Sequence, residues 1–100
     1  MVRPRIPRRI NFEPGTTYFK PAGVPLRMLE EVVLSFEEVE ALRLKDIEGL
    51  EQTKAAKKMH ISQPTFYRML STARKKTAEA IIKGKAIRIE NKKFGALQEK

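Results

Sequence analysis

The side chains best suited to chemistry lie between Gln52 and Ala78, a stretch without any aspartate or glutamate. Gln63 and Arg68 stand out within it, because glutamine can form two parallel hydrogen bonds to adenine and arginine can do the same to guanine. Lysine and arginine also bind nucleic-acid phosphates, since this binding releases condensed counterions. The basic residues of the stretch are Lys54, Lys57, Lys58, Arg68, Arg74, Lys75 and Lys76. The pattern favours a nucleic-acid surface, with a solvated helical face as the alternative explanation.

Few other residues could hold a metal or act in catalysis. The chain has no cysteine and one histidine, His60, which therefore lacks the partners that a metal site or an acid-base pair needs. Glu37, Glu38 and Glu40 could bind a divalent cation, but a helix dipole that favours acids in a first turn explains them better. We expect no metal, no cofactor and no enzymatic activity.

The charge of the whole chain agrees with a polyanionic partner. Its 100 residues include 21 Lys and Arg against 12 Asp and Glu, which gives a formal net charge of +9. The longest apolar runs are the three residues at 32–34 and at 80–82, so no segment can span a membrane. We expect a soluble, cytoplasmic protein with one domain.

Three helices must position the basic stretch, and the first is clearly marked. Ser35 and Glu38 form a capping box, which predicts a helix from Phe36 to Ile47. Gly49 is placed to end this helix in the left-handed conformation. The residues expected on its buried side are Phe36, Val39, Leu42, Leu44 and Ile47.

A second helix is expected from Glu51 to Met59, followed by a short turn. Ser62 can cap a third helix, which continues to Lys83 and ends at Gly84. Three- and four-residue steps place one set of side chains on the buried face of this helix, namely Phe66, Met69, Leu70, Ala73, Thr77 and Ile81.

The rest of the chain is expected to be irregular or extended. Five of the six prolines precede residue 26, which excludes helices there and leaves short extended pieces at 9–13, 17–20 and 31–34. Residues 86–90 alternate like a strand that could pair with the N-terminal extended segment. We predict a mainly α fold divided into an arm and extended segment packing on the helices (1–34), a helical DNA-binding domain (35–84) and a C-terminal strand with a flexible tail (85–100).

The second and third helices together have the features of a helix-turn-helix. Ala55 and Ala56 are small enough to let the two helices approach closely, although an ordinary helical hairpin shares this spacing. The start of the third helix is polar, with Ser62, Gln63, Thr65, Tyr67, Arg68 and Ser71 expected to face outward. Contacts to DNA phosphates are predicted from Gln52, Lys57, Lys58, Thr65, Arg74 and Lys75.

Two resemblances agree with this interpretation. Residues 36–76 resemble region four of bacterial sigma factors, in which an E..LRL...EG helix precedes an A..M.IS..T....L..AR helix-turn-helix. Residues 2–90 resemble more closely a family of small prokaryotic proteins of unassigned function, described as predicted DNA-binding proteins. This second resemblance rests on RPR at Arg3, TYFKPAGVPL at 17–26 and GKAIRIE at 84–90.

The resemblance implies a sigma-region-four-like fold and a transcriptional regulator without catalytic residues. It places one set of side chains toward the bases of the DNA groove, namely Ser62, Gln63, Tyr67, Arg68 and Ser71. The sequence departs from the pattern at the turn, where His60 occupies the position commonly taken by glycine. A left-handed residue other than glycine costs about 1 kcal/mol, so the turn and the tilt of the third helix are expected to adjust.

Two N-terminal features are open to more than one interpretation. Arg3, Arg5, Arg8 and Arg9 could form an arm that lies along DNA or enters its minor groove, or a solubilising tail. The TYFKPAGVPL segment is expected to pack over the helices, with a contact between two copies of the chain as the alternative. The residues involved are Tyr18, Phe19, Val24 and Leu26.

These observations predict a sequence-specific protein that binds double-stranded DNA and regulates transcription, with its third helix in the major groove. One alternative is a protein-interaction module that docks on RNA polymerase through Glu37, Glu38 and Glu40. A second is an RNA-binding protein that stacks bases on Tyr18, Phe19 and Tyr67. The sequence is also compatible with a homodimer.

Overall fold

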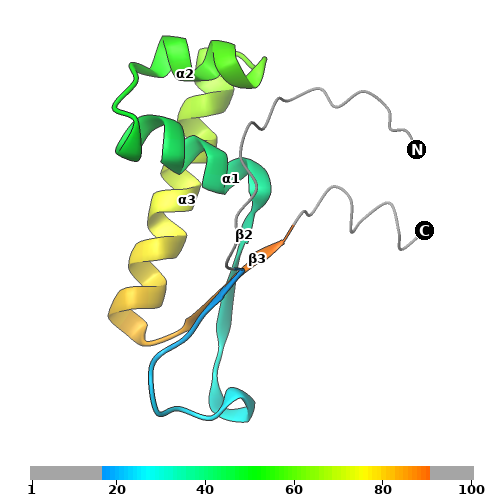
Figure 1. Ribbon diagram of the computed structural model, residues 1–100, viewed down its shortest axis with the longest axis vertical. Helices are drawn as coiled ribbons and strands as arrows, with labels where there is room; N and C mark the ends of the chain where they lie inside the picture. The colour runs from blue at the N-terminus through cyan, green and yellow to red at the C-terminus, as the bar shows by residue number, and fades with distance from the viewer. Residues whose placement is uncertain (1–16, 91–100) are drawn as a thin grey trace, which may run out of the picture.

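The computed structural model describes residues 17–90. Its chain forms a mainly helical protein with a small sheet (Figure 1). The sheet consists of strands β1 (Tyr18–Phe19), β2 (Glu31–Ser35) and β3 (Ala86–Glu90). The helices are α1 (Phe36–Leu42), α2 (Gln52–Met59) and α3 (Gln63–Lys83). Two short elements complete the order, a 3₁₀ turn at Leu26–Met28 and a π-helical turn at Arg43–Ile47.

Helix α3 connects two layers of packing. Helices α1 and α2 surround its N-terminal half and form what we call the helical head, residues 36–73, whereas the sheet lies beside its C-terminal half (Figure 1). The polar start of α3 therefore lies at the end of the molecule away from the sheet.

The predicted start of the first helix is confirmed. The Glu38 backbone N–H donates to the Ser35 hydroxyl at 3.0 Å, and the Ser35 N–H donates to the Glu38 carboxylate at 2.9 Å. These two bonds satisfy backbone donors that a helix start leaves free.

The predicted end of this helix at Ile47 is confirmed, and Gly49 is left-handed with φ of 75°. The type of the last turn was not predicted, because Arg43–Ile47 form a π-helical turn in which the Glu48 N–H donates to the Arg43 carbonyl at 2.9 Å. The wider turn changes the direction of the side chains that follow Leu44. Ile47, which was expected to be buried, is 78% exposed, so that expectation was wrong.

The core of the helical head combines alanines with larger apolar side chains. Ala55, Ala56 and Met59 of α2 are buried, and they pack in one cluster with Phe66 and Leu70 of α3. The predicted close approach of α2 and α3 through alanine is confirmed. Phe66 is the largest fully buried side chain in the described part of the chain.

A second cluster joins α3 to the sheet through Leu34, Ala73 and Ile89. Ile81 was expected to continue the buried face of α3, but it is 74% exposed and Ala80 is buried instead. The reason is helix geometry. A four-residue step such as Thr77 to Ile81 rotates by about 40° beyond a full turn, and this moves Ile81 off the buried side.

Strand β3 lies in the middle of the sheet, between β1 and β2. It pairs with β1 in the antiparallel direction, with Tyr18 opposite Arg88, and with β2 in the parallel direction, with Val33 opposite Arg88. The sequence predicted pairing of residues 86–90 with the N-terminal extended segment, but it specified neither the particular strand nor the direction. The extended piece expected at 9–13 lies outside the described residues.

Residues 17–26 were expected to pack over the helices, and the structure shows mainly their contacts with the sheet. The Tyr18 hydroxyl donates to Glu31 at 2.6 Å, whereas Phe19 lines a hollow together with Ala80 and Ile81 of α3. Leu26 is 63% exposed. The segment forms the edge of the sheet because its backbone pairs with β3.

One polar cluster links all three strands. The Arg88 guanidinium donates to both carboxylate oxygens of Glu31, at 2.8 and 3.0 Å, and lies 4.9 Å from the centroid of the Tyr18 ring. Hydrogen bonds from Arg88 and then from Tyr18 lower the pKa of Glu31 to about 2. The hydrogen bond to Glu31 raises the pKa of Tyr18.

This cluster predicts an acid dependence of stability. The pKa of Glu31 is lower in the folded protein than its ordinary value of 4.5, so its contribution is complete above pH 4.5 and is lost as the pH falls toward 2. We expect the wild-type protein to lose more stability than the Glu31→Gln variant between pH 6 and pH 2.5, as measured by urea unfolding. Tyr18→Phe keeps the bonds from Arg88 and should show an intermediate loss. Equal losses in wild type and Glu31→Gln would contradict the assignment.

Candidate nucleic-acid interface

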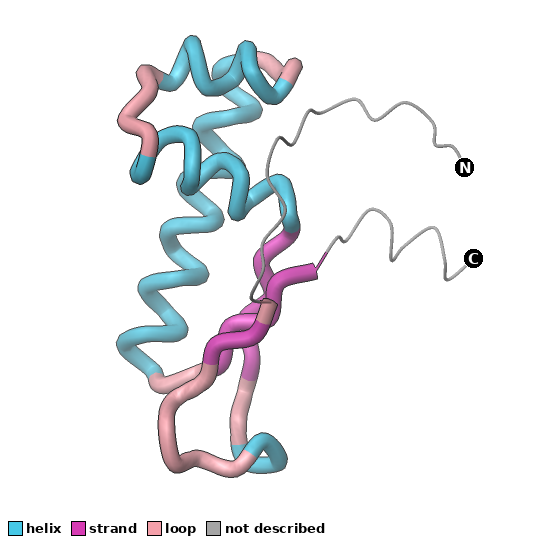
Figure 2. The backbone as a smooth tube through the Cα atoms, in the orientation of Figure 1, coloured by secondary structure: helices cyan, strands magenta, loops and turns pink. Residues whose placement is uncertain are grey.

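A tight turn sets the angle between α2 and α3 (Figure 2). His60 has the left-handed conformation, with φ of 61° and ψ of 42°, at the position where the sequence analysis expected strain. The Ile61 N–H donates to the Ala56 carbonyl and the His60 N–H to the Lys57 carbonyl, both at 3.1 Å. These two bonds close the end of α2 in a Schellman arrangement, so the left-handed residue is held by the backbone around it.

The cap of α3 uses two of the predicted DNA contacts. The Ser62 hydroxyl accepts from the Thr65 N–H at 3.2 Å and donates to the Thr65 hydroxyl at 2.9 Å. Ser62 is exposed, but its hydroxyl already has partners within the protein. The structure therefore gives Ser62 and Thr65 a role in starting the helix.

The remaining predicted base contacts lie together on the exposed side of α3. Gln63, Tyr67, Arg68 and Ser71 are all exposed, and Tyr67 is 56% exposed despite its aromatic ring. Steps of three and four residues keep these side chains on one face of a helix. We call this face the polar strip, residues Gln63, Tyr67, Arg68 and Ser71.

Neighbouring side chains restrain two members of the polar strip. The Gln63 amide donates to the Gln52 side chain of α2 at 3.4 Å, which brings together a predicted base contact and a predicted phosphate contact. The Arg68 guanidinium donates to the Thr65 hydroxyl, also at 3.4 Å. Both bonds are long, and both acceptors lie at the solvent boundary, so DNA could replace them.

Besides Arg68 of the polar strip, four cations of the acid-free stretch are exposed on α2 and α3, namely Lys54, Lys57, Lys58 and Lys75. Together with the polar strip they form a basic surface on these two helices.

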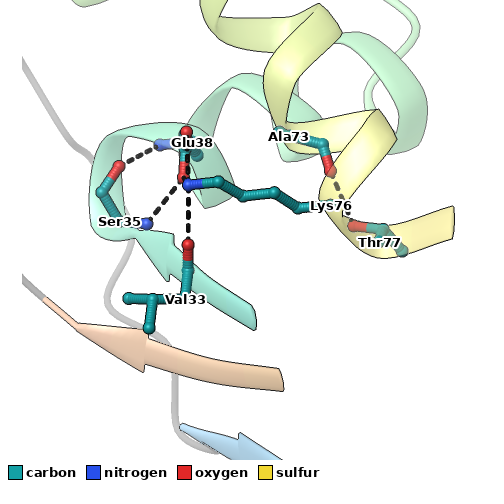
Figure 3. Close-up of polar contacts among 6 residues, drawn as sticks. All are labelled: Val33, Ser35, Glu38, Ala73, Lys76 and Thr77. Carbon is teal, nitrogen blue, oxygen red and sulfur yellow. Dashed lines mark hydrogen bonds and ion pairs between the residues drawn. The ribbon is translucent and has the colours of Figure 1, made fainter. Parts of the chain in front are cut away.

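The other two cations of the stretch are bound to acids from earlier in the chain. Lys76 donates to the Val33 carbonyl at 2.7 Å and to both oxygens of Glu38 at 3.0 and 3.1 Å, so it links α3 to the start of α1 (Figure 3). Arg74 donates to both oxygens of Asp46, at 2.5 and 3.2 Å. Sequence reasoning missed these pairs because their members are far apart in the chain.

The Asp46 and Arg74 side chains influence the titration of each other. Hydrogen bonds from Arg74 lower the pKa of the Asp46 carboxyl, and the same bonds raise the pKa of Arg74. Both groups are therefore charged over the whole neutral range. Arg74, which was predicted to contact a DNA phosphate, thus binds a carboxylate in the structure.

Two acids of α1, Glu38 and Glu40, form hydrogen bonds to other residues of the protein. Glu38 caps the helix and binds Lys76, and the fully buried Glu40 accepts two hydrogen bonds from Arg43, at 2.9 and 3.0 Å. Arg43 also bonds to Glu48 at 3.2 Å. The acidic run expected on the surface of this helix is thus partly structural.

Three further predictions from the sequence concern the N-terminal arginines, metal binding and membrane-spanning helices. Arg3, Arg5, Arg8 and Arg9 belong to residues 1–16, which the structure does not describe. Within residues 17–90, no group of three His, Cys, Asp or Glu side chains could hold a metal ion. In the same range, no helix combines the length and hydropathy needed to cross a bilayer.

Fold and surface together define a small, mainly helical protein with a three-stranded sheet and a basic face on α2 and α3. Residues 1–97 match the family described as "Protein of unknown function DUF134", and the chain belongs to that family. No solved structure is significantly similar to it.

Its relatives include several proteins named UPF0251. One from Moorella thermoacetica is 63% identical over 90 residues, which cover 90% of this chain and 60% of the relative. One from Caldanaerobacter subterraneus is 57% identical over 90 residues, covering 90% of this chain and 76% of the relative. One from Thermoanaerobacter sp. is 50% identical over 99 residues, covering 99% and 88%. The chain thus spans slightly less than two thirds of the Moorella protein and most of the other two.

Proposed function

We propose that this protein binds double-stranded DNA in a sequence-specific manner and regulates transcription, with α2 and α3 acting as a helix-turn-helix. The observation that carries the proposal is the polar strip of α3, which includes Arg68, together with four further exposed cations on α2 and α3 and no acid in the sequence from Gln52 to Ala78. A merely solvated helix would not need an acid-free stretch of sequence of this length.

The physical fit to B-form DNA has two parts. The major groove is about 12 Å wide and admits one helix, whose side chains can then contact base edges. Gln63 and Arg68 supply the side chains suited to adenine and guanine. The lysines of α2 and Lys75 of α3 flank the strip, where phosphates of the two groove walls would lie.

The two alternatives receive less support from the described residues. A docking surface on α1 would use acids that already bond to Lys76 and Arg43. Base stacking on RNA would use Tyr18, whose hydroxyl and ring are engaged by Glu31 and Arg88. Tyr67 is exposed, but it lies within the polar strip and serves duplex recognition equally well.

The test is binding of random-sequence duplex DNA measured by fluorescence anisotropy between 50 and 200 mM salt. Lys57→Ala and Lys75→Ala should each weaken binding to all sequences evenly. Each should also lower the slope of log K against log salt by about 0.9, because each removes one phosphate contact. Lys83→Ala is the matched control, since this exposed lysine lies in the last turn of α3, about 30 Å from Gln63.

Selection of bound sequences from a random duplex pool then tests specificity. A recurrent motif is expected, and a palindrome would in addition report a homodimer. Absence of duplex binding at low salt, or an effect of Lys83→Ala equal to that of Lys75→Ala, would contradict the proposal. Stronger competition by single-stranded RNA than by duplex DNA would favour the RNA-binding alternative.

A further inference from the structure

The pair formed by Arg74 and Asp46 lies on the helix that carries the polar strip, and its side chains are more exposed than those of the Lys76–Glu38 and Glu79–Lys85 pairs of the same helix. Both oxygens of Asp46 accept from the guanidinium, at 2.5 and 3.2 Å. Two parallel hydrogen bonds of this kind are also how arginine binds a phosphate. The side chains are 50% and 40% exposed, so DNA can reach the pair.

Position along α3 places Arg74 beside the polar strip. Arg74 follows Gln63 by eleven residues, or about three turns, and therefore projects from nearly the same side of the helix. Its neighbour Lys75 is one of the exposed cations. Asp46 reaches this side from the π-helical turn at the end of the first helix, outside the acid-free stretch.

We propose that Asp46 competes with the DNA backbone for Arg74 and so lowers the affinity for DNA of any sequence. This inference rests on the proposed function. A phosphate that approaches Arg74 must displace the carboxylate, and it then lies near an uncompensated negative charge. Contacts from Arg68 to bases are unaffected, so Asp46 lowers specific and non-specific binding alike and leaves their ratio unchanged.

A nearby acid provides a matched control. Glu48 lies two residues beyond Asp46, and its removal changes the net charge by the same amount. Its partner Arg43 stays bound to the buried Glu40 when Glu48 is replaced. Glu48→Gln therefore reports the general effect of removing a negative charge near the π-helical turn. Asp46→Asn removes a negative charge there as well, and in addition releases Arg74.

The experiment compares four proteins in anisotropy titrations with a random 30-base-pair duplex. At 0.1 M salt, one added phosphate contact corresponds to about an eightfold gain in affinity. Asp46→Asn should therefore bind about five- to tenfold more tightly than wild type, with a salt slope steeper by about 0.9. Glu48→Gln should gain less than about twofold, because screened surface charges act weakly at this distance. The double variant Asp46→Asn, Arg74→Gln should bind like wild type within about twofold, because it removes the released cation as well.

Circular dichroism and thermal unfolding verify that each variant is folded. Asp46→Ser is a second variant that lacks the same carboxylate. Equal affinities for Asp46→Asn and Glu48→Gln would overturn the inference, as would a gain that persists in the double variant. In either case duplex binding by wild type would leave the proposed function in place. Failure of the wild-type protein to bind any duplex would overturn both.

Discussion

Replacement of Arg68 by alanine is expected to remove discrimination at one base pair of the target site. The free-energy difference between the best site and the site altered at that base pair should fall by about 1–3 kcal/mol, which is the contribution of one bidentate contact to a base. Arg68 is placed for this role because it is exposed in the polar strip and its present bond to Thr65 is long, at 3.4 Å. The measurement is competition between the selected duplex and single-base variants of it.

Two comparisons separate base recognition from charge. Arg68→Lys keeps the cation but loses the planar fork, so it should retain the salt dependence and lose discrimination. Lys75→Ala should do the reverse, lowering the salt dependence while the preference between sites is kept. An unchanged ratio between the best site and random duplex in Arg68→Ala would show that this side chain does not contact a base.

Replacement of Phe66 by alanine is expected to destabilise the protein by about 3–5 kcal/mol. Phe66 is fully buried between α2 and α3, and truncation leaves a cavity that the small neighbours Ala55 and Ala56 cannot fill. Stabilities of natural domains are about 5–15 kcal/mol, so much of the total would be lost. Urea unfolding at equilibrium measures the change.

The adjacent residue is the matched control for Phe66. Tyr67 is of similar size but more than half exposed, so Tyr67→Ala should change the free energy of unfolding by less than about 0.5 kcal/mol. It should weaken duplex binding nevertheless, because Tyr67 belongs to the polar strip. A loss of stability in Tyr67→Ala comparable to that in Phe66→Ala would contradict the placement of the two side chains.

Local signals in the sequence were sufficient to place the helices. Ser35 with Glu38, Ser62 before Pro64, and Gly84 act through bonds to residues within a few positions, so they can be recognised without tertiary structure. For this reason the predicted ends of α2 and α3 agree with the structure to within one residue. The left-handed turn at His60, in contrast, was expected from the resemblance, in which glycine commonly occupies this position.

The features that sequence reasoning missed depend on distant partners or on irregular geometry. The exposure of Ile47 follows from a π-helical turn, and no local pattern indicated that turn. The parallel pairing of β2 with β3 joins segments that lie 55 positions apart in the sequence, with Glu31 opposite Ala86. Alternation in a strand indicates that pairing occurs but does not identify the partner.

The residues that make up the candidate site could be predicted from the sequence, but the ion pairs that they form could not. The exposed residues Gln63, Tyr67, Arg68 and Ser71 lie where helical periodicity placed them. The assignment of Arg74 as a simple phosphate contact omitted Asp46, which lies 28 positions away. An acid-free stretch of sequence is therefore a weaker indicator of unpaired charge than it first appears, because neighbours in space can supply the acids.

The central position of β3 has a consequence for how the chain acquires its structure. The buried residues of the helical head's core cluster lie between 41 and 70, so its contacts can form soon after that segment is synthesised. Strands β1 and β2 both pair with β3, which is the last element of the described chain, and neither pairs with the other. We therefore expect the head to fold first and the sheet to form in a slower, final step. During synthesis, β1 and β2 leave the ribosome before β3 and remain unpaired until β3 has been made.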